Sequence, residues 1–136
     1  MLIINPVQDK TKQADLCALC GIEYRVRDFA FAAYVDGEFV GLSQFYVTDE
    51  WGMLENIVPA PQKDDIEAMF ILGRQTLNWI DLLGIHTCRA NVNTGNAKLL
   101  KVMGFVPEND YLVADMTHMF DGHCGGNCDI AAQLHQ

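Results

Sequence analysis

The sequence predicts a mixed α/β (α+β) domain, and three observations support this class. Asp36-Gly37 lies between two apolar segments and is the strongest short signal for a β-hairpin. Residues 66–83 carry apolar side chains at helical spacing. Residues 89–105 have the pattern of a strand, a turn and a short amphipathic helix. We therefore expect a sheet whose first half is mostly antiparallel, with helices packed on it.

Composition favours a single folded domain spanning residues 1–136. Half of the residues are apolar and 20% are charged, as in globular proteins. No apolar run reaches the ~20 residues that a membrane span needs. The first residues lack the basic start of a signal peptide, so we expect a cytoplasmic protein.

The net charge of −9 argues against a nucleic-acid partner, because phosphates attract Lys and Arg. A polyanionic ligand would need a local basic patch, of which Lys98 and Lys101 provide a part. We expect neither a nucleic-acid nor a membrane partner, and a homodimer is compatible with the sequence.

The first elements follow from apolar runs and the residues that interrupt them. Residues 1–7 predict a strand that ends near Pro6, and residues 9–20 predict a helix that Gly21 stops. Residues 29–35 predict the first hairpin strand. The expected apolar positions of the first helix are Ala14, Leu16, Cys17, Leu19 and Cys20.

The second hairpin strand is expected at 38–47 and the next strand at 52–58, before Pro59 and Pro61. Asp64 or Asp65 then caps a long helix that Gly84 stops. The positions that give this helix a broad apolar face are Ile66, Met69, Phe70, Leu72, Leu77, Ile80 and Leu83.

The last elements are predicted as a strand at 85–92, a helix at 96–103 and a strand or hairpin within 105–119. The hairpin turn is expected at Glu108-Asn109-Asp110. The tail, 120–136, is rich in turn-forming residues.

Asn93 lies eleven positions before the pair Gly104-Phe105. This unit resembles the C-terminal half of the GNAT acetyltransferase fold, and the resemblance extends over residues 29–119. It implies a GNAT-like mixed, mostly antiparallel sheet with helices on both faces. It also implies an acyl-CoA-dependent N-acetyltransferase, with acetyl-CoA as co-substrate and a small amine or a protein or peptide amine as acceptor.

The family has an apolar strand end followed by R/Q-x-x-G-x-G/A, and segment 57–67 lies on this pattern. Ile57 and Pro59 match the strand end, Gln62 matches the R/Q position and Ile66 the apolar position. The residues that the resemblance assigns to the acyl-CoA site are Ile57, Val58, Gln62, Lys63, Asp64, Asp65, Ile66, Asn93 and Lys98.

The two glycine positions of this pattern are Asp65 and Glu67, and Asp64 adds a third carboxylate. In the family, free amides and the dipole of a helix N-terminus receive a pyrophosphate. Two interpretations remain open. Either these acids cap their own helix and the pyrophosphate site is weakened or lost, or they point outward and the amides still bind CoA.

Two catalytic candidates follow from the resemblance. Glu55 lies on the strand where many family members carry the general base, and desolvation between Leu54 and Asn56 would raise its pKa. The family's tyrosine acid is replaced by Leu100, so Tyr111 is the candidate proton donor. The alternatives are a solvent-facing Glu55 and a Tyr111 that only packs. Asn93 is equally compatible with a cofactor contact and a helix cap.

The five cysteines are expected to be reduced thiols. Cys88 is expected to be buried in its strand. A zinc site is the alternative for C-A-L-C at 17–20 and H-C-G-G-N-C at 123–128, through Cys17, Cys20, His123, Cys124 and Cys128. Packing of Cys17 and Cys20 as small apolar residues is favoured, and no metal is assigned.

Aromatic residues gather on the first hairpin, where they serve either the core or a substrate cleft. They are Phe29, Phe31, Tyr34, Phe39, Phe45, Tyr46 and Trp51. Two functions compete: N-acetyl transfer, and a GNAT-like fold without this activity that serves as a binding or assembly module. A zinc or redox protein is a third, supported only by the cysteines.

Overall fold

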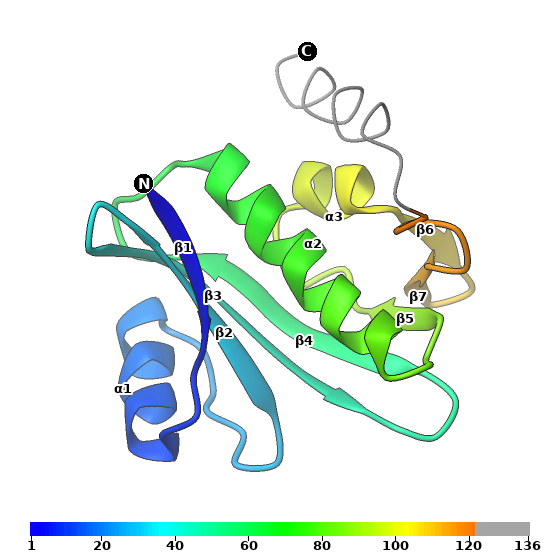
Figure 1. Cartoon of the computed structure of the whole chain (residues 1–136), viewed down its shortest axis with the longest axis horizontal. Helices are drawn as coiled ribbons and strands as arrows, with labels where there is room; N and C mark the ends of the chain where they lie inside the picture. Colours follow the sequence, from blue (N-terminus) through cyan, green and yellow to red (C-terminus); the bar gives the residue numbers. More distant parts are fainter. Residues whose placement is uncertain (122–136) are drawn as a thin grey trace.

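The structure is a computed structural model that describes residues 1–121, and these residues form one seven-stranded sheet and three helices (Figure 1). The strand order is β1-β2-β3-β4-β5-β7-β6, and every neighbouring pair is antiparallel except β4 and β5. The elements are β1 (Leu2–Pro6), α1 (Lys10–Cys20), β2 (Phe29–Val35), β3 (Glu38–Val47), β4 (Gly52–Pro59), α2 (Ile66–Leu82), β5 (Thr87–Ala90), α3 (Ala97–Met103), β6 (Phe105–Glu108) and β7 (Tyr111–Asp115). The predicted mixed, mostly antiparallel sheet is confirmed.

The helices cover both faces of the sheet, as expected. Along β2, Phe31 and Ala33 share a core cluster with Leu72 of α2, whereas Ala32 shares a second cluster with Cys17 of α1. Successive strand residues point to opposite faces, so α1 and α2 lie on opposite sides. Figure 1 shows α2 running across the sheet with α3 beside it.

The turn between β2 and β3 confirms the hairpin prediction. Asp36 and Gly37 both have positive φ, 52° and 86°, as a type I′ turn requires. Asp9 caps α1 by accepting hydrogen bonds from two amides of its first turn, and Gly21 ends that helix at φ 74°. These capping and turn residues therefore determine where the hairpin turns and where α1 begins and ends.

The buried face of α1 differs from the predicted one. Leu19 is 54% exposed, while Gln13 is fully buried beside Cys17. Gln13 Nε2 donates to Gln44 Oε1 of β3 at 3.0 Å. A buried amide is tolerated when it is hydrogen-bonded, so this helix docks through a polar contact that apolar periodicity does not predict.

The long helix α2 buries the predicted Met69, Leu72, Leu77 and Ile80, whereas Leu83 lies beyond its end and is 51% exposed, so its place on the apolar face is wrong. Asp65, rather than Asp64, is its N-cap, and Gly84 follows its end at φ 86°. Ser43 of β3 and Thr76 of α2 share a buried hydrogen bond of 2.8 Å, which fixes the helix on the sheet.

The second half has the predicted element order with corrected bounds. The strand expected at 85–92 extends only over β5. The helix cap is Asn96, whose side chain accepts from the amide of Leu99 at 3.1 Å, so of the two interpretations of Asn93 the helix cap is excluded. The hairpin between β6 and β7 turns at Asn109, which has φ 56°.

The described cysteines are thiols in apolar surroundings. Cys17 and Cys88 are buried and Cys20 is half-buried. Burial raises the pKa of Cys20 to about 11 and that of Cys88 to about 12, which disfavours the reactive thiolate. No cluster of metal-ligating side chains occurs within residues 1–121, and His123, Cys124 and Cys128 lie outside them.

None of the helices in this described part has the length and hydropathy that a membrane crossing requires.

Candidate functional site

The candidate site lies where β4 and β5 diverge. The two strands are parallel and pair only from Gly52–Cys88 to Leu54–Ala90. Beyond Leu54, β4 continues to Pro59 while the chain after Ala90 turns toward α3. A pair of neighbouring parallel strands that separate in this way exposes backbone groups at their inner edges.

In this chain Thr94 fills the divergence. The amide of Ile57 donates to the carbonyl oxygen of Thr94 at 2.8 Å, and Thr94 Oγ1 donates to the carbonyl oxygen of Leu54 at 3.1 Å. The Thr94 hydroxyl also accepts from the amide of Asn91 at 2.9 Å. Thr94 is 1% exposed, so the turn at 91–94 completes the edge of β4 from within the chain.

The backbone contact at this point is close. A Cβ atom added to Gly95 would lie 2.6 Å from the carbonyl oxygen of Ile57, so only glycine fits there. Ala60 donates to Val40 on the β3 side, and amides alternate between the two edges of a strand. The next position facing the divergence after Ile57 is therefore Pro59, which has no amide hydrogen.

The turn before α2 carries the three carboxylates noted in the sequence. Asp65 Oδ1 accepts from the amide of Ala68 at 3.0 Å and so occupies a group that a phosphate would otherwise use. Asp64 and Glu67 are exposed beside it. Lys63 Nζ is paired with Glu38 at 2.9 Å. The turn caps its own helix, as the first interpretation expects.

The remaining positions assigned to the acyl-CoA site surround these two features. Gln62 is exposed at φ 65°, Val58 is half-buried on β4, and Ile66 is the first residue of α2. Asn93 is exposed next to Thr94, and Lys98 is exposed on α3. The structure thus places Ile57 against Thr94, the residue after Asn93, at the divergence, while segment 62–66 lies at the start of α2.

Glu55 lies on a β-bulge of β4. Leu54 pairs with Phe45 and Asn56 pairs with Gln44, so Glu55 is the extra residue between them. Its carboxylate lies 3.4 Å from Arg27 Nη2 and 3.7 Å from Arg25 Nε. The side chain is 11% exposed. Glu55 lies on the sheet face opposite α2, and its role as a general base stays a prediction.

Asp28 is a second carboxyl in this cluster, and sequence reasoning missed it. It is fully buried, and neither carboxylate oxygen has a hydrogen-bond partner within the described residues. Burial, with the negative charge of Glu55 as the next cause, raises the pKa of Asp28 to about 6, although Arg27, Arg25 and Lys10 act in the opposite direction. The only sequence signal was the charged segment R-V-R-D just before β2.

An arginine–aromatic row extends from this cluster across the same sheet face. It consists of Arg27, Tyr46, Trp51, Arg89 and Tyr111. Arg27 lies 4.2 Å above the ring of Tyr46, which is 6.0 Å from Trp51, and Arg89 lies 4.5 Å from Trp51 and 5.0 Å from Tyr111. All five residues retain exposed surface, and α1 packs against β2 and β3.

The two predicted catalytic residues therefore share one sheet face but not one contact. Glu55 pairs with Arg25 and Arg27, while Tyr111 stacks on Arg89 at the far end of the row. Leu100 is buried in the core at 1% exposure, which leaves no proton donor at that position.

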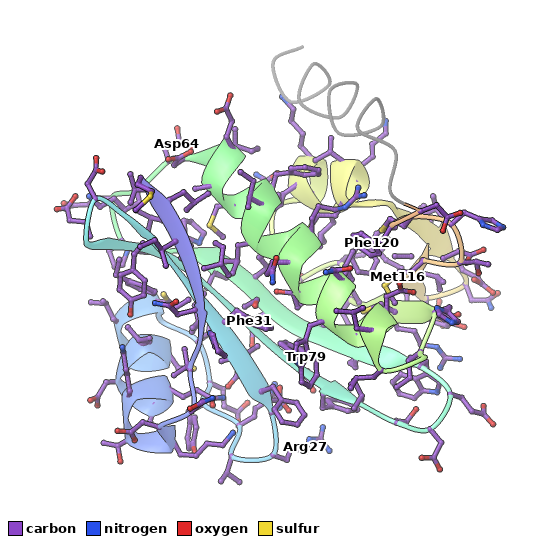
Figure 2. The ribbon with its side chains drawn as sticks, viewed as in Figure 1. Arg27, Phe31, Asp64, Trp79, Met116 and Phe120 are labelled. Carbon is purple, nitrogen blue, oxygen red and sulfur yellow. The ribbon has the colours of Figure 1, made fainter. Side chains whose placement is uncertain are left out.

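The aromatic residues of the first hairpin divide between two uses. Tyr46 and Trp51 belong to the open face, whereas Phe29, Phe31 and Phe45 join Trp79 of α2 around a cavity of about 400 Å³ on the α2 side. Figure 2 shows Phe31 and Trp79 facing one another, with Asp64 at the opposite end of α2 and Arg27 beyond the lower end of the sheet.

Comparison of this architecture with solved structures decides the fold. The ribosomal-protein-S18-alanine N-acetyltransferase of Escherichia coli superposes with a TM-score of 0.68 at 14% identity, covering 90% of this chain and 99% of that one. The chain has the GNAT fold. A spermidine N-acetyltransferase from Vibrio cholerae gives a TM-score of 0.67 at 12% identity, covering 88% and 96%. PaiA N-acetyltransferase from Thermoplasma acidophilum, solved in complex with coenzyme A, gives 0.65 at 12%, covering 85% and 99%.

The GNAT likeness is structural. No protein-family model matches the chain, and no curated protein matches it in sequence. The structural likeness confirms the fold prediction made from Asn93 and Gly104-Phe105. In this fold β4 and β5 diverge beside Glu55.

Proposed function

We propose that the chain is an acyl-CoA-dependent N-acetyltransferase that uses acetyl-CoA and acts on a small amine or a protein or peptide amine. The observation that carries the proposal is the position of Glu55. Its carboxylate lies on the bulge where β4 leaves β5, and it faces an uncovered sheet surface. Several proteins of similar structure contain CoA or acetyl-CoA, which supports the choice of donor.

In this mechanism Glu55 accepts a proton from the acceptor ammonium. The neutral amine then attacks the thioester carbonyl carbon, the carbon–sulfur bond breaks, and the thiolate takes a proton from Tyr111. The nitrogen releases its second proton as the amide forms, and this proton restores Tyr111. Glu55 and Tyr111 on one face thus act as the base and the acid of the reaction. Asp28 is fully buried, so its role is to set the charge around Glu55.

The donor must reach the thioester position through the divergence that Thr94 now fills. An extended ligand would take the amide of Ile57 from Thr94, which exchanges one hydrogen bond for another. We propose that the turn at 91–94 moves away when acetyl-CoA binds between 57–66, Asn93 and Lys98.

The contacts of Thr94 and Asp65 favour a second candidate function, a binding module without acetyl transfer. Thr94 satisfies the edge of β4 and Asp65 satisfies the start of α2, so the two places that a CoA arm and a phosphate would use are occupied by the chain itself. The uncovered sheet face would then bind a ligand without acylating it.

Two measurements on the whole chain test the proposal. Acetyl-CoA at about 100 times its dissociation constant should add about 2.7 kcal/mol to the free energy of unfolding. Release of CoA in the presence of an amine panel should be lowered by ~10²-fold or more in Glu55→Gln, because the amide cannot accept a proton.

The matched control is Glu23→Gln, which removes another carboxylate partner of Arg25 at an exposed loop position. It should retain the wild-type rate. Absence of stabilisation by acetyl-CoA would contradict the proposal and leave the binding module as the function. Equal rates for Glu55→Gln and wild type would remove Glu55 from the mechanism.

A further inference from the structure

In the described part of the chain, one cation of the arginine–aromatic row has no carboxylate counter-charge. Arg27 is paired with Glu55, and Arg25 with Glu23 and Glu55. Within residues 1–121, Arg89 forms no ion pair with a carboxylate. Its guanidinium is held between the rings of Trp51 and Tyr111 and remains partly exposed. Such a guanidinium keeps its hydrogen-bond donors available for a planar anion.

The opposite end of the row holds two carboxyl groups, Glu55 and Asp28, beside Arg27, whose Nε lies 3.6 Å from Asp28 Oδ1. Glu55 meets its two arginines at 3.4 and 3.7 Å, longer than the ~2.7–2.9 Å of a strong charge-assisted hydrogen bond. The buried oxygens of Asp28 and the buried Nε of Arg25 have no hydrogen-bond partners in the described part of the chain. Buried polar atoms without partners are rare in folded proteins, and here they lie directly beneath the Glu55 carboxylate and its arginines.

The spacing between the two ends fits a short molecule. Met53 of β4 is the register partner of Arg89 on β5, and Glu55 lies two residues further along β4. Strand spacing and rise place the backbones of Glu55 and Arg89 about 8 Å apart. Met53 and Tyr46 are neighbours in the register of β4 and β3 and form the apolar floor between these charges.

We infer that this face binds a free amino acid, with the ammonium at Glu55 and the carboxylate at Arg89. Because Glu55 is an anion and Arg89 is a cation, a ligand that carries both charges on a short chain should bind more tightly than an amine alone or a carboxylate alone. The inference rests on the proposed function, since it names the acceptor class of that site. Binding of the acceptor does not itself require acyl transfer.

The test is calorimetric titration of the full chain, without acetyl-CoA, with ligands that differ in one property. Glycine, β-alanine and γ-aminobutyrate vary the separation of the charges, and butylamine and butyrate each supply one charge. We expect at least one of the three amino acids to bind about tenfold tighter than either single-charge ligand, since a second charged contact of ~1.4 kcal/mol corresponds to that factor.

Arg89→Met should reduce the affinity for that amino acid to the level of butylamine, and Arg89→Lys should restore part of it. The matched control is Arg74→Met, because Arg74 also stacks on two rings, Phe70 and Phe120, but belongs to α2 on the other face. It should leave the selectivity unchanged. Circular dichroism of each variant verifies that the fold is retained.

Three outcomes would overturn the inference: no saturable binding of any amino acid at about 10 mM, butylamine binding as tightly as the best amino acid, or unchanged selectivity in both Arg89 variants. A separate titration with acetyl-CoA distinguishes this failure from that of the proposed function. Amino acids that bind to a chain with no affinity for acetyl-CoA support the binding module, whereas acetyl-CoA binding without amino-acid binding leaves transfer intact with another acceptor.

Discussion

Asp28 illustrates how one residue can store free energy that depends on pH. Its carboxyl is buried without hydrogen bonds, so the charged form lacks the solvation that water provides in the unfolded chain. Its pKa rises from an ordinary 3.8 to about 6 in the folded state. The native state therefore binds more protons than the unfolded state between these two values.

The consequence for stability has a definite sign. Because the folded state holds the extra proton, the free energy of unfolding falls as pH rises from about 4 through about 6. Asp28→Asn has no proton to lose and should be more stable relative to wild type at pH 8 than at pH 4. The difference should change by roughly 3 kcal/mol across this window. Urea denaturation of both proteins at the two pH values measures it.

Asp115→Asn is the control for this measurement. Hydrogen bonds from Thr117 lower the pKa of Asp115, so its contribution is present at high pH and is lost as pH falls. The two substitutions should therefore change the pH dependence in opposite directions. Parallel stability curves for Asp28→Asn and wild type would show that Asp28 titrates normally.

At this scale the sequence supplied candidates. Glu55 is a candidate because the resemblance places a base on its strand, and its position two residues before Ile57 can be read from the sequence. Thr94 and Arg89 are not, because their roles depend on a partner across the sheet: β4 for Thr94, and Trp51 and Tyr111 for Arg89. Asp28 was missed because burial of a carboxyl without hydrogen bonds contradicts the usual preference of that residue type.

Among the elements, the start of α2 is where the two candidate functions differ most directly. Asp65 caps the helix through Ala68, with Glu67 in the first turn. Replacing both with Gly should tighten acetyl-CoA binding by more than tenfold, because close like charges cost on the order of 1 kcal/mol each near a wet surface. The same change should destabilise the helix by about 1 kcal/mol at the interior position. Calorimetric titration and thermal unfolding measure the two effects.

Asp9→Gly provides the comparison, because Asp9 caps α1 in the same way but lies on the other face. It should lower stability without affecting acetyl-CoA. If the native chain binds acetyl-CoA at low micromolar concentration and the double variant binds no better, the carboxylates point away from the phosphates. If neither form binds, the turn has lost this role.

Element boundaries were predictable where glycine or proline sets them. Gly21, Gly84 and the Asp36-Gly37 turn lie at the predicted helix and strand ends, since positive φ is a local requirement. Asn96 was missed as a cap because Asn93, three positions earlier, is an equally good cap by residue type. The choice between them depends on Thr94 being held against β4, which only the tertiary structure determines.

At the scale of the whole molecule, charge predicts an unusual salt dependence. The net charge is −9, and the donor that we propose is itself a polyanion. Added salt shortens the screening length from ~30 Å at 0.01 M to ~10 Å at 0.1 M and so weakens their repulsion. We expect the affinity for acetyl-CoA to rise over this range, as measured by calorimetric titration.

Potassium chloride and tetramethylammonium chloride should give the same trend, which excludes binding of a specific cation. An affinity that falls with salt, as at a basic phosphate site, would show that local positive charge dominates the overall field.

The short parallel seam between β4 and β5 joins two antiparallel halves of the sheet, and we expect these halves to open separately. Three register pairs join the antiparallel sheet β1–β4 to the antiparallel sheet β5–β7, and the bond from Ile57 to Thr94 is added beyond them. The amides of each half find most of their partners within that half, so each half can open with few broken bonds in the other. Amide hydrogen exchange should accordingly give β5–β7 and β1–β4 different opening free energies. The amide of Ile57 should exchange when β4 and β5 separate.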